Sequence, residues 1–261
     1  MVNLMDLEAI KNIAVKAAYN GGKSLVKHFG NLKNYSKKGE IDLVTIADIE
    51  SEKAILDTIQ ERFPDHGILA EESGRINGDG GLWIIDPLDG TTNFANNIGL
   101  FSISIAFASE GELMAGVVMN PVSGELFTAE KGKGARLNGH PICVSTSKKV
   151  SNSLLVTGFP YNLRTTLKTL MIRFENCLKA SMGVRRMGSA ALDLCYVASG
   201  RFSGFWEQNL KPWDTAAGTL VAREAGAMVT DFSGVFFSPD KKEILATNGL
   251  IHDEMISLLT I

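Results

Sequence analysis

The sequence lacks the features that mark several large classes of protein. Its 261 residues include only three cysteines, Cys143, Cys177 and Cys195, which lie in apolar stretches and form no CxxC pair. This argues against a disulfide scaffold, so we expect reduced core cysteines. No apolar run approaches the roughly 18 residues of a membrane span, and the N-terminal segment lacks the order of a signal peptide. These absences predict a soluble, cytoplasmic protein.

Positive charge is not in excess either. Lys and Arg number 26 against 29 Asp and Glu, so the net charge is −3, and a surface built mainly to hold a nucleic-acid backbone is not expected. None of the four histidines has His or Cys at metal-ligand spacing, which argues against a zinc site. GxGxxG after a strand and GxSxG are both missing. Gly22-Lys23-Ser24 resembles the end of a P-loop, but it lacks the earlier glycine and lies within a helical pattern.

The composition, 45% hydrophobic and 21% charged, is that of an ordinary globular protein. Apolar spacing predicts helices over 4–28, with Gly30 after it, and over 47–63, with Asp48 as N-cap. The glycine-rich stretch 73–81 is interpreted as an exposed loop. Short apolar runs from 82 to 130 predict an antiparallel sheet.

After about residue 150 strands and helices alternate, which indicates layered α/β packing. Nothing in the composition divides the chain, so we expect one unit, 1–261, with sub-layers of about 1–145 and 146–261. The expected helices of the second part cover 163–180, 189–199, 213–225 and 251–259.

The most informative segment is Asp86-Pro87-Leu88-Asp89-Gly90. An apolar strand ends at Asp86, Pro87 is expected to stop that strand, and Asp89 follows one turn later, so both carboxylates can meet at one point. Gly90 allows close backbone approach, and the next residues can begin a short helix whose N–H groups face an anion.

Carboxylates and N–H groups that bind an anion can share one site if a cation bridges the carboxylates to a phosphate. The segment therefore indicates a metal-phosphate site. Two other segments supply acids: Glu71 and Glu72 follow an apolar run, and Asp214 begins an Ala-rich stretch. The alternative is structural: solvated aspartates at a turn, an ordinary strand exit at Glu71, and Asp214 as a helix N-cap.

Three of these segments together resemble the motifs of the inositol monophosphatase family. The members of that family are magnesium-dependent, lithium-sensitive phosphatases. The resemblance implies a layered α-β-α-β-α sandwich of the sugar phosphatase type, in the α/β class, and a homodimer. The motifs are EES at 71–73, WIIDPLDGTTNF at 83–94 and WDTAAG at 213–218, and the likeness extends through DLVTIAD at 42–48, GARLNGHPICVS at 134–145 and GSAALDL at 188–194.

The resemblance also implies a set of metal ligands. One Mg²⁺ would be held by Glu71, Asp86 and the Leu88 carbonyl oxygen. A second would be held by Asp86, Asp89 and Asp214, and a weaker third ion would lie near Glu71. Independently of the resemblance, four carboxylates in one pocket need divalent cations to offset their repulsion.

The catalytic residues implied are Glu71 and Thr91, with Asp48 behind them, which would orient a metal-activated water for in-line attack on phosphorus. The remaining residues fall into two groups, those expected to bind substrate and those at positions near the site. The substrate group is Asp89, Gly90, Thr91, Gly188, Ser189, Ala190, Glu207 and Asp214. In the second group, Lys37 would lie near the metal, and Arg185 and Arg186 would contact a second phosphate or a partner subunit. The alternative for these three basic residues is that they are solvated surface side chains.

The expected function is therefore Mg²⁺-dependent hydrolysis of inositol monophosphate to inositol and phosphate. One alternative keeps this chemistry and changes the substrate to fructose 1,6-bisphosphate or 3′-phosphoadenosine 5′-phosphate. Another alternative is a non-catalytic regulatory protein that retains the fold.

Overall fold

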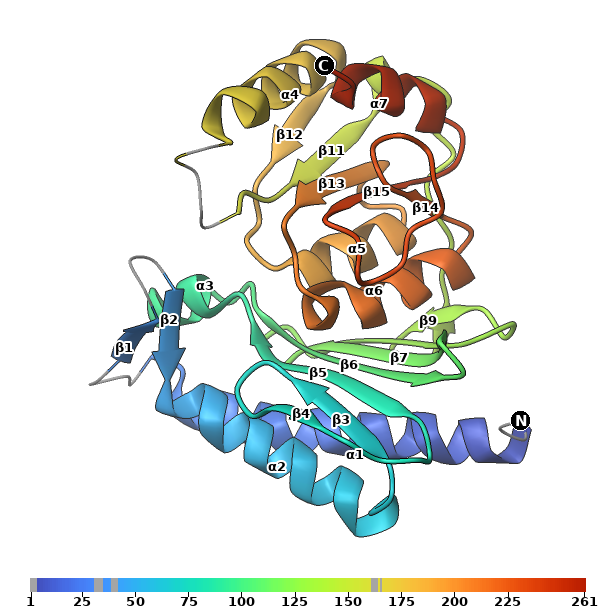
Figure 1. Ribbon diagram of the computed structural model, residues 1–261. Coiled ribbons are helices and arrows are strands. Elements are labelled where there is room, and N and C mark those ends of the chain that lie inside the picture. Colours follow the sequence, from blue (N-terminus) through green and yellow to red (C-terminus); the bar gives the residue numbers. More distant parts are fainter. Residues whose placement is uncertain (1–3, 31–34, 39–41, 161–163, 165) are drawn as a thin grey trace.

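The computed structural model describes residues 4–30, 35–38, 42–160, 164 and 166–261. Five layers are stacked on one another, alternately helices and sheet, as Figure 1 shows. The α-β-α-β-α arrangement expected from the sequence is thereby confirmed. A separate two-stranded sheet, β1 (Tyr35–Lys38) and β2 (Asp42–Thr45), projects beside the first layer.

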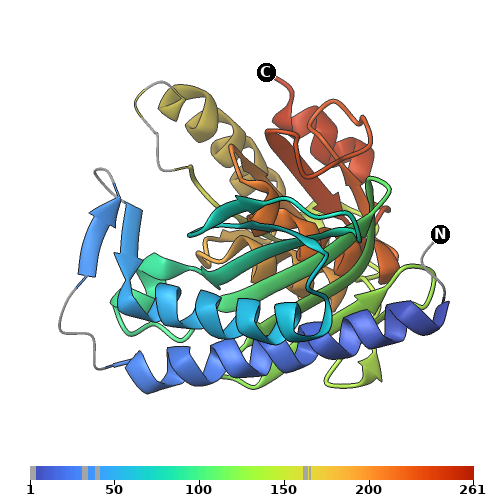
Figure 2. The ribbon, with the colours of Figure 1, turned by 60° about the horizontal axis from the view of Figure 1, so that its bottom comes forward.

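The first layer is the helix pair α1 (Leu4–His28) and α2 (Ile46–Arg62), which lie side by side across one face of the large sheet (Figure 2). Both helices pack an apolar stripe on the sheet, and Leu25 and Ile55 are fully buried there with Trp83 and Phe107. Burial of each such side chain contributes roughly 1.5–3 kcal/mol.

The second layer is a sheet of eight strands in the order β10-β9-β8-β7-β6-β5-β3-β4. Neighbouring strands are antiparallel except β3 and β5, which are parallel. The strands are β3 (Gly67–Ala70), β4 (Gly74–Ile76), β5 (Leu82–Asp89), β6 (Ser102–Ser109), β7 (Glu112–Asn120), β8 (Glu125–Glu130), β9 (Ala135–Leu137) and β10 (His140–Pro141).

The third layer is formed by α5 (Ala190–Ala198) and α6 (Pro212–Glu224), between the two sheets. Every residue of α5 is buried, as expected for a helix that is apolar on all sides. The fourth layer has the strand order β12-β11-β13-β15-β14, and α4 (Leu167–Ala180) and α7 (His252–Leu259) cover its outer face. Its strands are β11 (Leu154–Thr157), β12 (Gly183–Arg185), β13 (Gly204–Gln208), β14 (Met228–Thr230) and β15 (Glu243–Thr247).

Four local predictions are wrong. Asp48 is not an N-cap, because α2 begins directly after β2 at Ile46 and Asp48 lies in its first turn. Pro87 does not end β5, which continues to Asp89 across an irregular register with β6; a bulge tolerates a residue without an N–H group. The stretch 73–81 contains β4, and Cys143 is exposed because it lies on the connection that follows β10.

Among the described helices, none combines the length and apolar character needed to cross a bilayer.

Candidate functional site

The end of β5 brings two carboxylates to one place through an irregularity in the strand. Asp86 pairs with Ser104 of β6 and Asp89 with Ser102, and the register shifts between the two pairs. The Asp86 carboxylate accepts the backbone N–H of Leu88 at 2.9 Å, which fixes the bend. Because a regular strand would send Asp86 and Asp89 to opposite faces, the bulge is what directs both toward the layer formed by α5 and α6.

Helix α2 supports this bend and the turn that follows β3. The Ser51 hydroxyl donates to the carbonyl oxygen of the β5 proline at 3.0 Å. The Glu52 carboxylate accepts the backbone N–H groups of Glu72 at 2.9 Å and Ser73 at 2.8 Å. Asp48, which is 2% exposed, precedes them by three and four residues and so shares their helix face. One helix therefore fixes the turn after β3 and directs a buried carboxylate toward the bend.

The short helix α3 (Thr91–Ala95) follows the bend directly. Its N-cap, Gly90, has φ of 100°, and a Cβ there would lie 3.1 Å from the Gly188 carbonyl oxygen, so only glycine fits without strain. The Thr91 hydroxyl donates to the Leu88 carbonyl oxygen at 3.0 Å. The chain thus brings Gly90, Thr91 and Gly188 together, although Gly90 and Gly188 are far apart in the sequence.

The N-terminus of α5 binds the Asp89 carboxylate. The Ser189 hydroxyl donates to it at 2.6 Å, and the N–H groups of Ala190 and Ala191 donate at 3.3 and 2.8 Å. Ser102 of β6 reaches Ser189 at 3.1 Å. Burial raises the pKa of Asp89 to about 6, while these hydrogen bonds act in the opposite direction. Asp89 is therefore held between the large sheet and α5, and the Ala190 N–H, expected from the resemblance to face substrate, is bonded to Asp89 here.

The first turn of α6 supplies Asp214. The structural alternative for Asp214, that of a helix N-cap, is wrong, because Lys211 holds that position and Asp214 is the third helical residue. Its carboxylate reaches back to accept the Lys211 N–H at 2.7 Å and lies close enough to Asp86 for the two carboxyl groups to affect each other's pKa. The pKa of Asp214 is raised to about 7, mainly by burial and to a smaller extent by the charge of Asp89. The chain thus brings Asp214 close to Asp86.

Electrostatic repulsion is strongest at Asp86. Its pKa is well above the usual value because it is buried, and also because Glu71, Asp89 and Asp214 repel its charge. Carboxylate oxygens are the ligands that Mg²⁺ prefers, so the donor chemistry fits this ion. In the described part of the chain, however, no group of three or more His, Cys, Asp or Glu is arranged to hold a metal as it stands. This is consistent with the bonds that Asp89 and Asp214 make to backbone N–H groups.

A cavity of about 450 Å³ opens beside these acids. It lies between the turn after β3 and the segment that leads into α6, and Glu207 of β13 lies in its wall. The pKa of Glu207 is raised to about 8, mainly by burial and to a smaller extent by the charge of Asp214. The residues around the cavity are Glu71, Glu72, Phe159, Pro160, Glu207, Asn209, Leu210, Lys211, Trp213 and Asp214.

The three basic residues singled out in the sequence differ in their positions. Lys37 pairs with Leu43 in the β1–β2 sheet, and its side chain lies outside the described part of the structure. Arg185 is exposed on β12, an edge strand, and bonds the Val184 carbonyl oxygen. Arg186 is exposed, but its guanidinium lies beside Gly188, where a Cβ would be 2.7 Å from Nη1, and its charge opposes the rise in the pKa of Glu207.

Several residues that support the site carry no motif in the sequence. Asp193 of α5 is 1% exposed, one of its carboxylate oxygens has no hydrogen-bond partner, and burial together with Glu207 raises its pKa well above the usual value. A Cβ at Gly158 would overlap the Glu207 carboxylate. Asp193 follows Ser189 by four positions, and Glu52 follows Asp48 by four. Because residues four apart share a helix face, this spacing could have indicated both. No comparable signal marks Gly158.

Comparisons with known proteins identify the family to which the chain belongs. The model of the inositol monophosphatase family matches residues 6–260. Inositol-1-monophosphatase of Rhizobium meliloti is 44% identical over 234 residues, 88% of each chain. Nus factor SuhB of Escherichia coli is 44% identical over 227 residues, 85% of each chain.

A solved structure is similar over almost its full length. It is the extragenic suppressor protein suhB from Bartonella henselae, with a TM-score of 0.93 and 43% identity over 97% of this chain and 98% of that one. The match in sequence and in fold covers every element that carries the acids. The chain therefore belongs to the inositol monophosphatase family.

Proposed function

We propose that this phosphatase hydrolyses inositol monophosphate to inositol and inorganic phosphate, and that it requires Mg²⁺. Membership of the family supports the phosphatase activity. The observation that carries the proposal is the convergence of Glu71, Asp86, Asp89 and Asp214, whose mutual repulsion raises the pKa of Asp86. A protein without a use for cations would gain stability by replacing such acids with neutral residues.

The proposed ligands follow the resemblance stated above. Glu71, Asp86 and the Leu88 carbonyl oxygen would hold one Mg²⁺, Asp86, Asp89 and Asp214 a second, and a weaker third would lie near Glu71. When bound, Mg²⁺ neutralises the acids, lowers the pKa of water and stabilises the leaving oxygen.

The protein's own groups would orient the water and the phosphate. The Thr91 hydroxyl uses its proton to bond Leu88, so its oxygen can accept a hydrogen bond from a water. Glu71 would accept the other proton of that water, and the buried Asp48 would support this arrangement. The N–H groups of Gly90 and Thr91, at the start of α3, would bind phosphate oxygens.

The alcohol half of the substrate would lie in the cavity of about 450 Å³, where Glu207 is in the wall. A carboxylate suits vicinal hydroxyl groups because it accepts two hydrogen bonds at once. Asp89 and the backbone of Gly188, Ser189 and Ala190 would complete this half of the site. The same metal-binding acids would also suit fructose 1,6-bisphosphate or 3′-phosphoadenosine 5′-phosphate, so these are the substrates to compare.

The test is phosphate release by the purified full-length protein. We expect the highest kcat/KM with inositol monophosphate among the three substrates, at millimolar Mg²⁺, and no release with a chelator. Asp214→Asn should lose activity, whereas Asp57→Asn, which alters an exposed ion pair with Lys53, should keep it. A higher kcat/KM for either alternative would change the substrate. Absence of release from all three would favour the regulatory alternative.

We also propose a cytoplasmic homodimer that lithium inhibits. Exposed apolar side chains on α4, among them Leu167, Met171 and Leu178, support an association surface. Sedimentation at micromolar concentration should give twice the monomer mass of 28.2 kDa; a monomer would contradict the dimer. Lithium should lower phosphate release at saturating Mg²⁺, and an unchanged rate would contradict inhibition.

A further inference from the structure

A second cavity lies at the other end of α6, away from Asp214. It has a volume of about 230 Å³ and is lined by Arg223 in the last helical turn. At about 1.5 Å per residue, roughly 14 Å of helix separate Arg223 from Asp214. The apolar part of the wall is formed by Leu113, Leu220, Phe236, Phe237 and Pro239.

Among the described residues, no carboxylate forms an ion pair with the Arg223 guanidinium. One terminal nitrogen donates to the Phe237 carbonyl oxygen at 2.5 Å, and the group lies 3.9 Å from the centre of the Phe236 ring. Its Nε is buried without a hydrogen-bond partner. Burial lowers the pKa of Arg223 to about 10, and among the described residues no carboxylate opposes this effect. Since cations that lose part of their hydration are normally paired, the half-buried guanidinium lacks an anionic partner among the described residues.

The other charged groups at this cavity already have partners. Lys131 forms an ion pair with Glu112. Glu224 accepts the backbone N–H groups of Gly132 and Gly134, both at 2.8 Å. Among the described residues that line the cavity, Arg223 is therefore the cation left for an anionic ligand.

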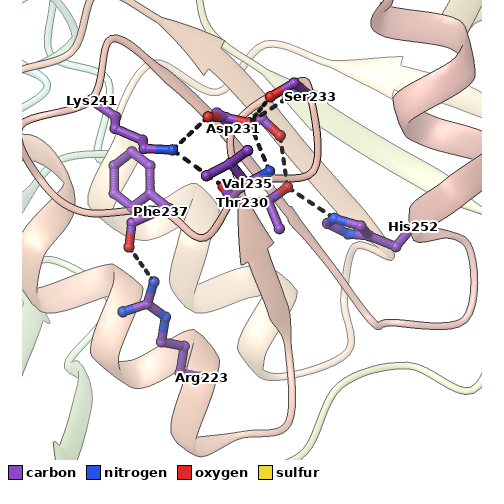
Figure 3. A network of polar contacts seen from close by, with 8 residues as sticks. All are labelled: Arg223, Thr230, Asp231, Ser233, Val235, Phe237, Lys241 and His252. Atoms are coloured by element: carbon purple, nitrogen blue, oxygen red, sulfur yellow. Dashed lines mark hydrogen bonds and ion pairs between the residues drawn. The ribbon is translucent and has the colours of Figure 1, made fainter.

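The outer wall is held in place without any ligand. As Figure 3 shows, Asp231 accepts hydrogen bonds from the Ser233 N–H, the Val235 N–H and the Lys241 ammonium group, at 3.0, 3.0 and 2.5 Å. The preceding residue, Thr230, is hydrogen-bonded to His252 of α7 at 2.9 Å. The loop that carries Phe236 and Phe237 is thus ordered by its own contacts, and a preformed wall lowers the cost of binding.

We propose that this cavity binds a small monocarboxylate with a compact apolar body, such as an aromatic or short aliphatic acid. The planar guanidinium matches a carboxylate in geometry, and the apolar wall matches the hydrocarbon. The volume is below the roughly 300–1,000 Å³ of drug-sized sites, so the ligand is small. A phosphate dianion fits less well, because one cation would oppose two charges and the apolar wall cannot solvate the second.

Calorimetric titration of the full-length protein tests this proposal, with benzoate as the probe, benzamide as its neutral analogue and inorganic phosphate as the competing anion. Each titration is run with Mg²⁺ and with a chelator, since binding at Arg223 does not depend on the acids at the other end of α6. Arg223→Gln is compared with Arg201→Gln. Arg201 also lies over an aromatic ring, at 4.8 Å, but it is paired with Glu125.

We expect benzoate to bind in both conditions and benzamide to bind about tenfold more weakly or worse, the effect of losing a charge-assisted hydrogen bond. Arg223→Gln should weaken benzoate binding by a similar factor, and Arg201→Gln should not change it. Failure of benzoate to bind, binding that requires Mg²⁺, equal binding of benzamide, or tighter binding of phosphate would each overturn the proposal. The comparison of benzoate with benzamide uses wild-type protein, so the test stands even if Arg223→Gln does not fold.

Discussion

Without metal, the protein should lose stability as the pH rises from about 4 to 8. The carboxyls of Asp89, Asp214 and Glu207 have pKa values of about 6, 7 and 8 in the folded chain, against 3.8, 3.8 and 4.5 ordinarily. The folded chain therefore holds more protons than the unfolded chain in this range, and stability falls with pH wherever that is so. The stabilisation is complete below the unfolded pKa and is lost as the pH passes through the folded values.

The size of the loss follows from Asp89. A rise of its pKa from 3.8 to about 6 corresponds to about 3 kcal/mol at 1.36 kcal/mol per pH unit. Asp89 is partly open to the solvent, and the three acids share the same repulsion, so their effects do not add. Asp89 alone would lose only about half of this between pH 5 and 8, but Asp214 and Glu207 titrate within that range. We therefore expect about 3 kcal/mol for the three acids together. Mg²⁺ at 100 times its Kd should restore about 2.7 kcal/mol.

Thermal unfolding followed by circular dichroism from pH 5 to 8 measures this effect, with a chelator and with Mg²⁺. At roughly 2–4 °C per kcal/mol for a chain of this size, the metal-free Tm should fall by roughly 6–12 °C, and Mg²⁺ should recover most of the fall at pH 8. Asp89→Asn should flatten the metal-free profile, and Asp57→Asn should leave it unchanged. A metal-free Tm that is constant with pH, or one that Mg²⁺ does not raise at pH 8, would refute the reasoning.

Three substitutions test the support of the site. Ser189→Ala removes one donor to the Asp89 carboxylate and should lower kcat about tenfold, with Ser189→Thr restoring it; unchanged steady-state kinetics of the alanine variant would contradict this role. Gly158→Ala should push the Glu207 carboxylate out of position and raise KM for inositol monophosphate about tenfold while sparing p-nitrophenyl phosphate, which has no vicinal hydroxyls; equal effects on both substrates would argue against it. Glu52→Gln removes one of the two carboxylate oxygens that accept the backbone N–H groups of Glu72 and Ser73. It should lower the free energy of unfolding by about 1–3 kcal/mol, and an unchanged midpoint in chemical unfolding would exclude the contact.

Much of the fold could be predicted, because apolar spacing and turn residues are local signals. The helical stripe of 4–28 became α1, and the apolar runs after 82 became the antiparallel strands β5 to β8. The errors lie where tertiary structure overrides a local rule. Pro87 lies within β5 because the bulge tolerates it, and Cys143 is exposed although its neighbours are apolar.

The site was predictable in its acids and less so in what holds them. Asp89 ends β5 and Asp214 lies in the first turn of α6, positions that the sequence indicates, whereas Asp86 lies within β5. The resemblance brought the three together. The partners of Asp89 could not be derived by local rules, because Ser189 is 100 residues away and contacts it only through the packing of α5 on the large sheet. Glu52 was missed for a similar reason, since it acts on the backbone of another segment.

The most direct test of the account is a crystal structure of the protein with Mn²⁺ in place of Mg²⁺, in which anomalous scattering locates the ions. We expect at least two ions about 3.5–4 Å apart, with Asp86 binding both and Asp214 binding one. Ions found elsewhere, or none near Asp86, would contradict the claim that acids from three distant segments form a metal site for phosphate ester hydrolysis.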